Sequence, residues 1–175
     1  MTSSPYGVNM STLRKAVSAA LVLALIASPA MAKSKQTTRV ATGRTGQVLT
    51  VLNAAAVSDG QEIWAIGKNY NAGIGIYVAF CEMPAKGTRP DHCFGGININ
   101  QSSHGSIWIS SNPPFYGKFI ATPYGPGGTF KVKIQVAAMI DSTDCRVTTC
   151  GIVTRADHTR GNYRKADVFV PVTFK

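Results

Sequence analysis

Four cysteines stand in two short pairs, Cys81 with Cys93 and Cys145 with Cys150, behind an N-terminal segment that has the pattern of an export signal. An even number of cysteines in an exported chain indicates disulfides, because the thiols meet an oxidising compartment. Four cysteines allow three pairings, and pairing within each segment is favoured because each pair bounds a short, turn-like loop. The sequence therefore predicts two local disulfides, each stabilising the fold by ~2–3 kcal/mol.

The export signal has three parts. Arg14 and Lys15 precede an apolar run over 16–27, and Ala32 ends a small-residue motif of the kind that a signal peptidase cleaves. The apolar run is shorter than the ~20 residues of a membrane-spanning helix. We therefore expect residues 1–32 to be a cleaved signal peptide, and the protein to be secreted or associated with the cell envelope.

The remaining chain is basic. Residues 1–32 hold two of the 18 basic residues and none of the eight acidic ones, so residues 33–175 carry a net charge of +8. A basic exported protein is attracted to anionic envelope polymers or lipid headgroups, although scattered charge also serves solubility. We expect residues 33–45, which are polar, basic and without periodicity, to form a flexible tail before one domain over 46–175.

The domain has the periodicity of β-strands throughout. The clearest alternation runs from Phe130 to Ala138, where apolar residues stand at even positions and lysine or glutamine at 131, 133 and 135. Pro171 cannot donate to a ladder, which indicates that the last strand lies at a sheet edge. Such spacing, with Gly/Pro turns between strands, predicts an all-β Greek-key sandwich. The expected strands are 47–53, 62–67, 76–82, 106–110, 130–138, 151–155 and 168–174.

One long connection interrupts this pattern. Residues 111–129 are rich in proline, glycine and aromatic residues, and a loop of this length is often functional. We expect a short strand near 119–122 within it. Trp108 stands opposite two isoleucines in the preceding strand, which predicts that its side of the strand is exposed.

Short motifs are spaced along the domain: Ser58-Asp59-Gly60, Gly67, Ala72-Gly73, Tyr77, Cys81, Asp144-Cys145, Cys150, Ala156-Asp157, Gly161-Asn162 and Phe174. Together they resemble the neocarzinostatin family of secreted actinobacterial proteins, over roughly residues 46–175. The resemblance implies a seven-stranded, immunoglobulin-like sandwich with two local disulfides. Three further segments, 108–114, 123–128 and 154–160, resemble the sandwich domain attached to haem-uptake modules of actinobacterial envelope proteins.

The family resemblance also implies a binding cleft. Its apoproteins hold an enediyne chromophore, which attacks DNA, in a cleft lined by aromatic side chains. Two of those aromatic positions hold Met83 and Ile140 here, and the family carriers are acidic whereas this chain is basic. We expect a cleft for an apolar or planar small molecule, walled by both disulfides and by the loops 111–129 and 155–165. The expected ligand-binding residues are Met83, Phe94, Trp108, Phe115, Tyr116, Tyr124, His158, Arg160 and Tyr163.

Catalytic motifs are missing from the sequence. It contains no G-x-S-x-G elbow and no H-E-x-x-H pair, and the adjacent residues of Asp91-His92 and Asp157-His158 need not face each other. A metal site at Asp91-His92-Cys93 is the alternative to a disulfide there, but the cysteine spacing is not that of a structural zinc site. We expect no enzyme activity, no metal and no cofactor. The arginines of 155–165 could hold a phosphate, a carboxylate or haem propionates, or form a solvated loop.

Three functions remain open. The first is an exported, non-enzymatic module that binds a small molecule. The second is a structural or protein-interaction domain of the cell envelope, linked to haem uptake. The third is an antibacterial or DNA-directed role as in the family, although no nucleic-acid-binding signature is present and nucleic acid is not an expected partner. No other long apolar run follows the signal, so we expect no membrane-spanning segment in the exported protein.

Overall fold

The computed structural model describes residues 37–96 and 103–175, so the signal peptide expected over 1–32 lies outside the described residues. Three 3₁₀ helices of three residues each accompany the strands in this part of the chain, and none of the described helices could cross a membrane. The elements are β1 (Thr38–Thr42), β2 (Val48–Leu52), β3 (Glu62–Lys68), β4 (Ile76–Glu82), β5 (Ser106–Ile109), η1 (Phe115–Gly117), β6 (Phe130–Gln135), β7 (Met139–Ile140), β8 (Thr143–Asp144), β9 (Cys150–Ala156), η2 (His158–Arg160), η3 (Arg164–Ala166) and β10 (Val168–Val172).

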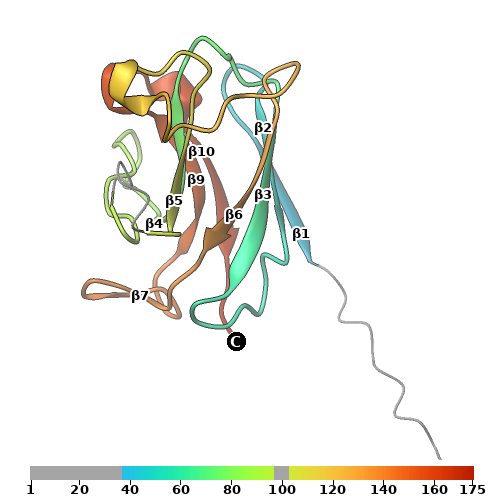
Figure 1. The fold of residues 1–175 in the computed structure, drawn as a ribbon. Helices are drawn as coiled ribbons and strands as arrows, with labels where there is room; N and C mark the ends of the chain where they lie inside the picture. Colours follow the sequence, from blue (N-terminus) through green and yellow to red (C-terminus); the bar gives the residue numbers. More distant parts are fainter. Residues whose placement is uncertain (1–36, 97–102) are drawn as a thin grey trace, which may run out of the picture. The chain divides into compact units, whose positions relative to one another are not determined.

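Two antiparallel four-stranded sheets form the domain (Figure 1). The first sheet has the order β1-β2-β3-β6 and the second β10-β9-β4-β5, while β7 and β8 form a separate hairpin. The chain crosses between the sheets from β3 to β4, from β5 to β6 and, after the β7–β8 hairpin, from β6 to β9, so neighbours in space are not always neighbours in sequence. This arrangement confirms the predicted all-β Greek-key sandwich, and β10 with Pro171 lies at a sheet edge as expected.

Each of the seven expected strands is present. They correspond to β2, β3, β4, β5, β6, β9 and β10, with ends that differ from the prediction by up to three residues. The segment near 119–122 does not form a strand and makes only an isolated bridge between Ile109 and Thr122. Both disulfides pair as predicted, Cys81 with Cys93 and Cys145 with Cys150.

The expectation of a flexible tail over 33–45 is wrong for part of that segment. Residues 38–42 form β1, which pairs with β2 along its whole length, from Thr38 opposite Leu52 to Thr42 opposite Val48. The Arg39 guanidinium also reaches across to the second sheet and donates to the Pro171 carbonyl at 2.9 Å. Backbone pairing and this side chain hold the strand, although its inward positions carry no large apolar residue.

The core lies between the inner faces of the two sheets. Leu49, Ile63 and Ile134 of the first sheet are at most 1% exposed, and they pack with a matching apolar set from the second sheet. Burial of each such side chain stabilises the fold by about 1.5–3 kcal/mol. The partners from the second sheet are Ile76, Val78, Phe80, Ile109, Ile152, Val168, Val170 and Val172.

The outer face of the second sheet is buried as well. Every residue of β4 from Ile76 to Cys81 is buried, including those whose side chains point away from the core. Loop segments cover this face, so the exposed side that we expected for Trp108 is absent and the indole is 2% exposed. The loops over this face provide the sites described next.

Candidate functional site

The loop between Cys81 and Cys93 is held against the outer face of the second sheet. The disulfide closes the loop, and the Glu82 amide donates to the His92 carbonyl at 3.0 Å. Arg155 of β9, which is 4% exposed, donates from Nη1 to the Pro90 carbonyl at 2.6 Å and to the Asp91 carboxylate. Burial lowers the pKa of Arg155, and the nearby Arg89 lowers it further. A disulfide at one end and a buried guanidinium therefore fix the shape of this loop.

A pocket of about 290 Å³ lies between this loop and the β10 edge of the sheet. We call it the disulfide-loop pocket. Phe169 supplies an apolar surface, since it packs against the small cluster of Ala79, Cys81, Cys93 and Val153 beneath the loop. The full lining is Arg44, Pro84, Gly87, Pro90, Arg164, Asp167, Val168 and Phe169.

Among the described residues, guanidinium groups outnumber carboxylates around this pocket. Arg164 binds the Asp167 carboxylate and also donates to the Thr88 carbonyl. Burial raises the pKa of Asp167, and the neighbouring Arg164, Arg155 and Arg44 offset that rise only in part. The lining itself contains two guanidinium groups, those of Arg44 and Arg164, and one carboxylate, that of Asp167. In the adjoining loop, Asp91 pairs with both Arg89 and Arg155. The pocket therefore combines an apolar wall with an excess of positive charge.

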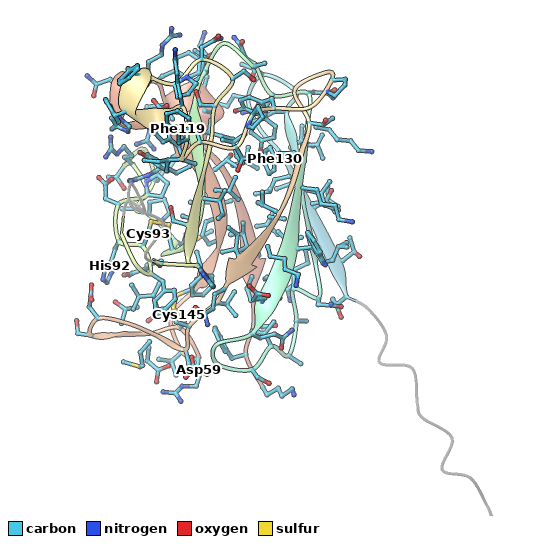
Figure 2. The ribbon with its side chains drawn as sticks, viewed as in Figure 1. Asp59, His92, Cys93, Phe119, Phe130 and Cys145 are labelled. Carbon is cyan, nitrogen blue, oxygen red and sulfur yellow. A yellow bond between two sulfur atoms is a disulfide. The ribbon has the colours of Figure 1, made fainter. Side chains whose placement is uncertain are left out.

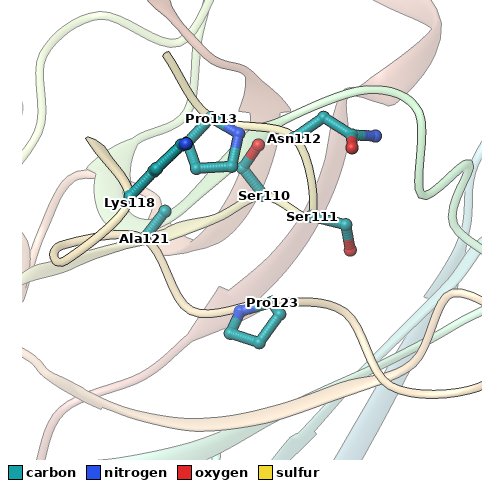
Figure 3. Close-up of a pocket in the computed structure, with 7 residues that line it drawn as sticks. All are labelled: Ser110, Ser111, Asn112, Pro113, Lys118, Ala121 and Pro123. Atoms are coloured by element: carbon teal, nitrogen blue, oxygen red, sulfur yellow. The ribbon is translucent and has the colours of Figure 1, made fainter. Parts of the chain in front are cut away.

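A second pocket, of about 410 Å³, lies in the connection after β5. Figure 3 shows Ser110, Pro113 and Lys118 around one side of it and Pro123 across from them. Its lining is mostly small and polar, with Lys118 as the charged residue among those described. Such a surface offers less apolar contact to a ligand than the disulfide-loop pocket does.

Three of the expected ligand-binding residues, Trp108, Tyr116 and His158, come together, but their polar groups are already hydrogen-bonded within the protein. The two ring nitrogens of His158 lie 2.6 Å from the hydroxyls of Tyr77 and Tyr116. Trp108 donates from Nε1 to Oδ2 of Asp157 at 2.9 Å, and its ring centroid lies 5.0 Å from that of His158. In this arrangement Trp108, Tyr116 and His158 close the outer face of the sheet over Tyr77.

The other expected residues lie apart. Phe94, Tyr124 and Tyr163 pack against the core, and the latter two line a cavity of only about 10 Å³, room for one water at most. Met83, Phe115 and Arg160 are exposed.

The two disulfides lie on opposite faces of the second sheet. Cys81 pairs with Gly151, next to Cys150, but Cys81 and Cys93 pack in the outer cluster whereas Cys145 and Cys150 pack in the core. Figure 2 shows Cys145 and Phe119 toward opposite ends of the sandwich, with Cys93 between them. The lining of the disulfide-loop pocket includes Arg164 of the 155–165 loop and no described residue of 111–129. The second pocket is lined by no described residue of the loop between Cys81 and Cys93. The walls that we expected around one cleft thus belong to different surfaces.

Sequence reasoning missed most of the pocket. Arg44 lies in the segment 33–45 that the sequence predicts to be a tail, and no sequence pattern marks Pro84 and Pro90 as part of a pocket. Phe169 did leave a signal, because a large aromatic residue between the inward Val168 and Val170 stands on the side of an edge strand that would otherwise face water. An apolar residue at such a position indicates a covered face or a binding surface.

One histidine has two acidic partners. His92 Nδ1 lies 2.8 Å from Glu82 Oε2 and its Nε2 lies 3.1 Å from Asp141 Oδ2. The Thr143 hydroxyl donates to the same Glu82 oxygen at 3.1 Å, so it does not serve as a nucleophile paired with the imidazole. No group of three His, Cys, Asp or Glu side chains within 37–96 and 103–175 is arranged to hold a metal ion.

These features define a disulfide-stapled β-sandwich with an arginine-rich pocket beside one disulfide. The architecture agrees with the neocarzinostatin-like fold that the sequence resemblance implied. The structure is similar to that of macromomycin, with 14% identity and a TM-score of 0.49, over 74% of this chain and 99% of macromomycin. The sequence matches no protein-family model and has no significant match among curated proteins.

Proposed function

We propose that this protein is an exported, non-enzymatic module that binds a small molecule in the disulfide-loop pocket. The observation that carries the proposal is the pairing of an apolar wall, formed by Phe169 and two prolines, with more guanidinium groups than carboxylates. The volume of about 290 Å³ is near the lower end of ~300–1,000 Å³ for ligand pockets. The two ends of the lining are also fixed, by the disulfide and by the buried Arg155, so little ordering is required on binding.

The lining indicates the chemistry of the ligand. An apolar or planar body would lie against Phe169, and a carboxylate, sulfonate or phosphate would pair with Arg44 and Arg164. Haem has a planar body and two propionates, so the resemblance to domains of haem-uptake proteins makes it one candidate within this class.

Two measurements test the proposal. Native mass spectrometry of the exported protein from its own culture should show a mass excess that disappears on denaturation. Titration with anilinonaphthalene sulfonate, a planar anionic probe, should give saturable fluorescence, and competition by haemin would identify haem as a ligand of the same site.

Matched arginine variants locate the binding. Arg164→Gln should weaken binding of the probe about tenfold, the loss of one charge-assisted hydrogen bond. Arg146→Gln is the control, because Arg146 also pairs with one aspartate, Asp144, at 2.8 Å but lies on the other disulfide loop. Equal affinities of the two variants, together with a bare polypeptide mass, would overturn the proposal.

A cell-envelope interaction domain is the second candidate. A pair of exposed phenylalanines on the connection after β5 favours it, since neither ring has a place in the pocket or the core. That surface is independent of the pocket.

A further inference from the structure

Four residues form an exposed tip on the connection between β5 and β6. Phe115 is 80% exposed, Phe119 is 90% exposed and Tyr116 is 52% exposed, with Lys118 between them in the sequence. We call Phe115, Tyr116, Lys118 and Phe119 the aromatic tip. It includes η1, which projects at one end of the sandwich in Figure 1, and Phe119 is labelled at that end in Figure 2.

The tip is held rigidly. A Cβ on Gly117 would lie 2.4 Å from Cη2 of Trp108, so only glycine lets the turn rest on the buried indole. Gly117 donates to the Pro114 carbonyl at 2.8 Å, and the amides of Ile120 and Ala121 donate to the Gly117 carbonyl at 3.0 and 2.8 Å. The two phenylalanines therefore cannot turn back into the core without breaking this anchored turn.

Tyr116 differs from the phenylalanines around it. Its hydroxyl lies 2.6 Å from His158 Nε2, which ties the tip to the loop that follows β9. Tyr116 thus serves as an anchor, while Phe115 and Phe119 present their rings to solvent.

Charge at the tip is positive. Lys118 Nζ lies over the Phe115 ring, 5.7 Å from its centroid, so a cation accompanies one of the exposed rings. Arg160 is exposed two residues beyond His158, and the segments 110–123 and 158–165 contain no acidic residue. The nearest acid in sequence, Asp157, is 2% exposed. Exposed apolar rings with cations nearby fit a bilayer surface, where rings enter the acyl boundary and cations contact lipid phosphates.

We propose that the aromatic tip inserts into the surface of a lipid bilayer that carries anionic headgroups. Phe115 and Phe119 enter the interface, and Lys118 and Arg160 contact phosphates. A protein partner is the competing occupant, but it would need a site shaped for two separate rings on a projecting turn. The net charge of +8 over residues 33–175 brings the protein to such a bilayer by long-range attraction, which favours the lipid surface.

Vesicle binding tests this proposal. The exported protein, which lacks the expected signal peptide, is mixed with phosphatidylglycerol vesicles and with phosphatidylcholine vesicles, and the bound fraction is measured by sedimentation. The double variant Phe115→Ser/Phe119→Ser should bind phosphatidylglycerol at least tenfold more weakly than the wild type, since each buried ring contributes to partitioning. Val147→Ser is the matched control, because Val147 is 85% exposed on the second disulfide loop and should not alter binding.

A local probe separates insertion by the tip from attachment by another segment. The variant Phe119→Trp should give shorter-wavelength emission with phosphatidylglycerol vesicles and be quenched by brominated acyl chains, beyond the response of the wild type. Lys118→Glu should reduce the preference for anionic over zwitterionic vesicles. Equal binding by the double variant and the wild type, or an emission spectrum of Phe119→Trp that does not change when vesicles bind, would overturn the proposal. Absence of binding to any vesicle would also overturn it and leave the tip to a protein partner.

Discussion

The indole nitrogen of Trp108 donates to Oδ2 of Asp157 at 2.9 Å, and both side chains are 2% exposed. The other carboxylate oxygen, Oδ1, accepts from the amide and the hydroxyl of Thr159 at 3.0 and 2.6 Å, so Asp157 also caps η2. A single carboxylate thus joins β5 to the loop after β9. Because Trp108 supports the aromatic tip through Gly117, the same carboxylate also positions that tip.

Removal of this carboxylate should destabilise the protein. Asp157→Ala leaves the buried indole N–H unpaired and removes the cap, and we expect a loss of about 2–4 kcal/mol in the free energy of unfolding. Asp157→Asn keeps an acceptor for Trp108 and should lose about half as much. Urea denaturation followed by fluorescence measures both, and equal losses for the two variants would contradict these roles of the hydrogen bonds.

Two adjacent glycines should differ in their tolerance of alanine. Gly127 and Gly128 have φ values of +67° and +66°, which glycine adopts freely, so an alanine at either position would be strained. A Cβ at Gly128 would lie 1.7 Å from the carbonyl oxygen of Tyr70, whereas nothing lies within 4 Å of a Cβ at Gly127. Gly127→Ala should lose about 1 kcal/mol and Gly128→Ala about 3 kcal/mol. Thermal unfolding compares them, and the expected order would be refuted by similar melting temperatures.

Strands were predictable where one face is apolar and the other polar. In β6 the residues Lys131 and Lys133 are exposed and Ile134 is fully buried, so the alternation in sequence equals the alternation in space. The edge position of Pro171 was also predictable from local chemistry, because a missing amide donor limits the strand to an edge whatever the rest of the fold does.

Prediction failed where tertiary contacts override local pattern. In β1 the inward residues are Arg39 and Ala41, so no apolar alternation marks the strand, and pairing with β2 decides its structure. The prediction of an exposed side for Trp108 was wrong because the sequence of a strand does not indicate which loops will cover it. The residues expected around one cleft lie on separate surfaces for the same reason. Contacts between distant residues position the loops, such as Arg155 with Pro90 in the loop between Cys81 and Cys93, and Gly117 with Trp108 in the loop 111–129.

His92 should make stability depend on pH. Hydrogen bonding to Glu82, and then to Asp141, raises the pKa of His92 above its ordinary value. The imidazolium therefore stabilises the fold fully below the pKa of the unfolded chain, about 6.5, and this contribution is lost as the pH rises through the higher folded pKa. An NMR titration should give a pKa for His92 above its ordinary value, and Glu82→Gln should lower it. A His92 pKa that does not respond to Glu82→Gln would rule out this ion pair in solution.

The two disulfides should contribute unequally. Cys81–Cys93 spans 12 residues and Cys145–Cys150 spans five. In the chain-entropy model loops of these sizes stabilise the fold by about 3 and about 2 kcal/mol. Paired serine variants, compared by urea denaturation, measure the difference. Loss of probe binding is expected only for the Cys81→Ser/Cys93→Ser variant, because only that disulfide shapes the disulfide-loop pocket. A similar loss for Cys145→Ser/Cys150→Ser would argue against a ligand in that pocket.

Asp167 should oppose ligand binding. Its carboxylate lines the disulfide-loop pocket, and its pKa is raised by burial, with Arg164, Arg155 and Arg44 offsetting part of the rise. As the pH falls through that raised pKa the carboxylate is protonated, the pocket gains positive charge, and an anionic sulfonate probe should bind more tightly. Asp167→Asn removes the charge at every pH, so it should bind the probe several-fold more tightly at pH 7 and lose most of the dependence on pH. Fluorescence titrations from about pH 4 to 7 measure both effects, because the pKa of Asp167 is raised above the ordinary aspartate value of about 3.9. Weaker binding of the probe by Asp167→Asn would contradict this prediction. It would mean that the carboxylate orients Arg164 toward the ligand, and that excess positive charge does not determine the affinity for an anion.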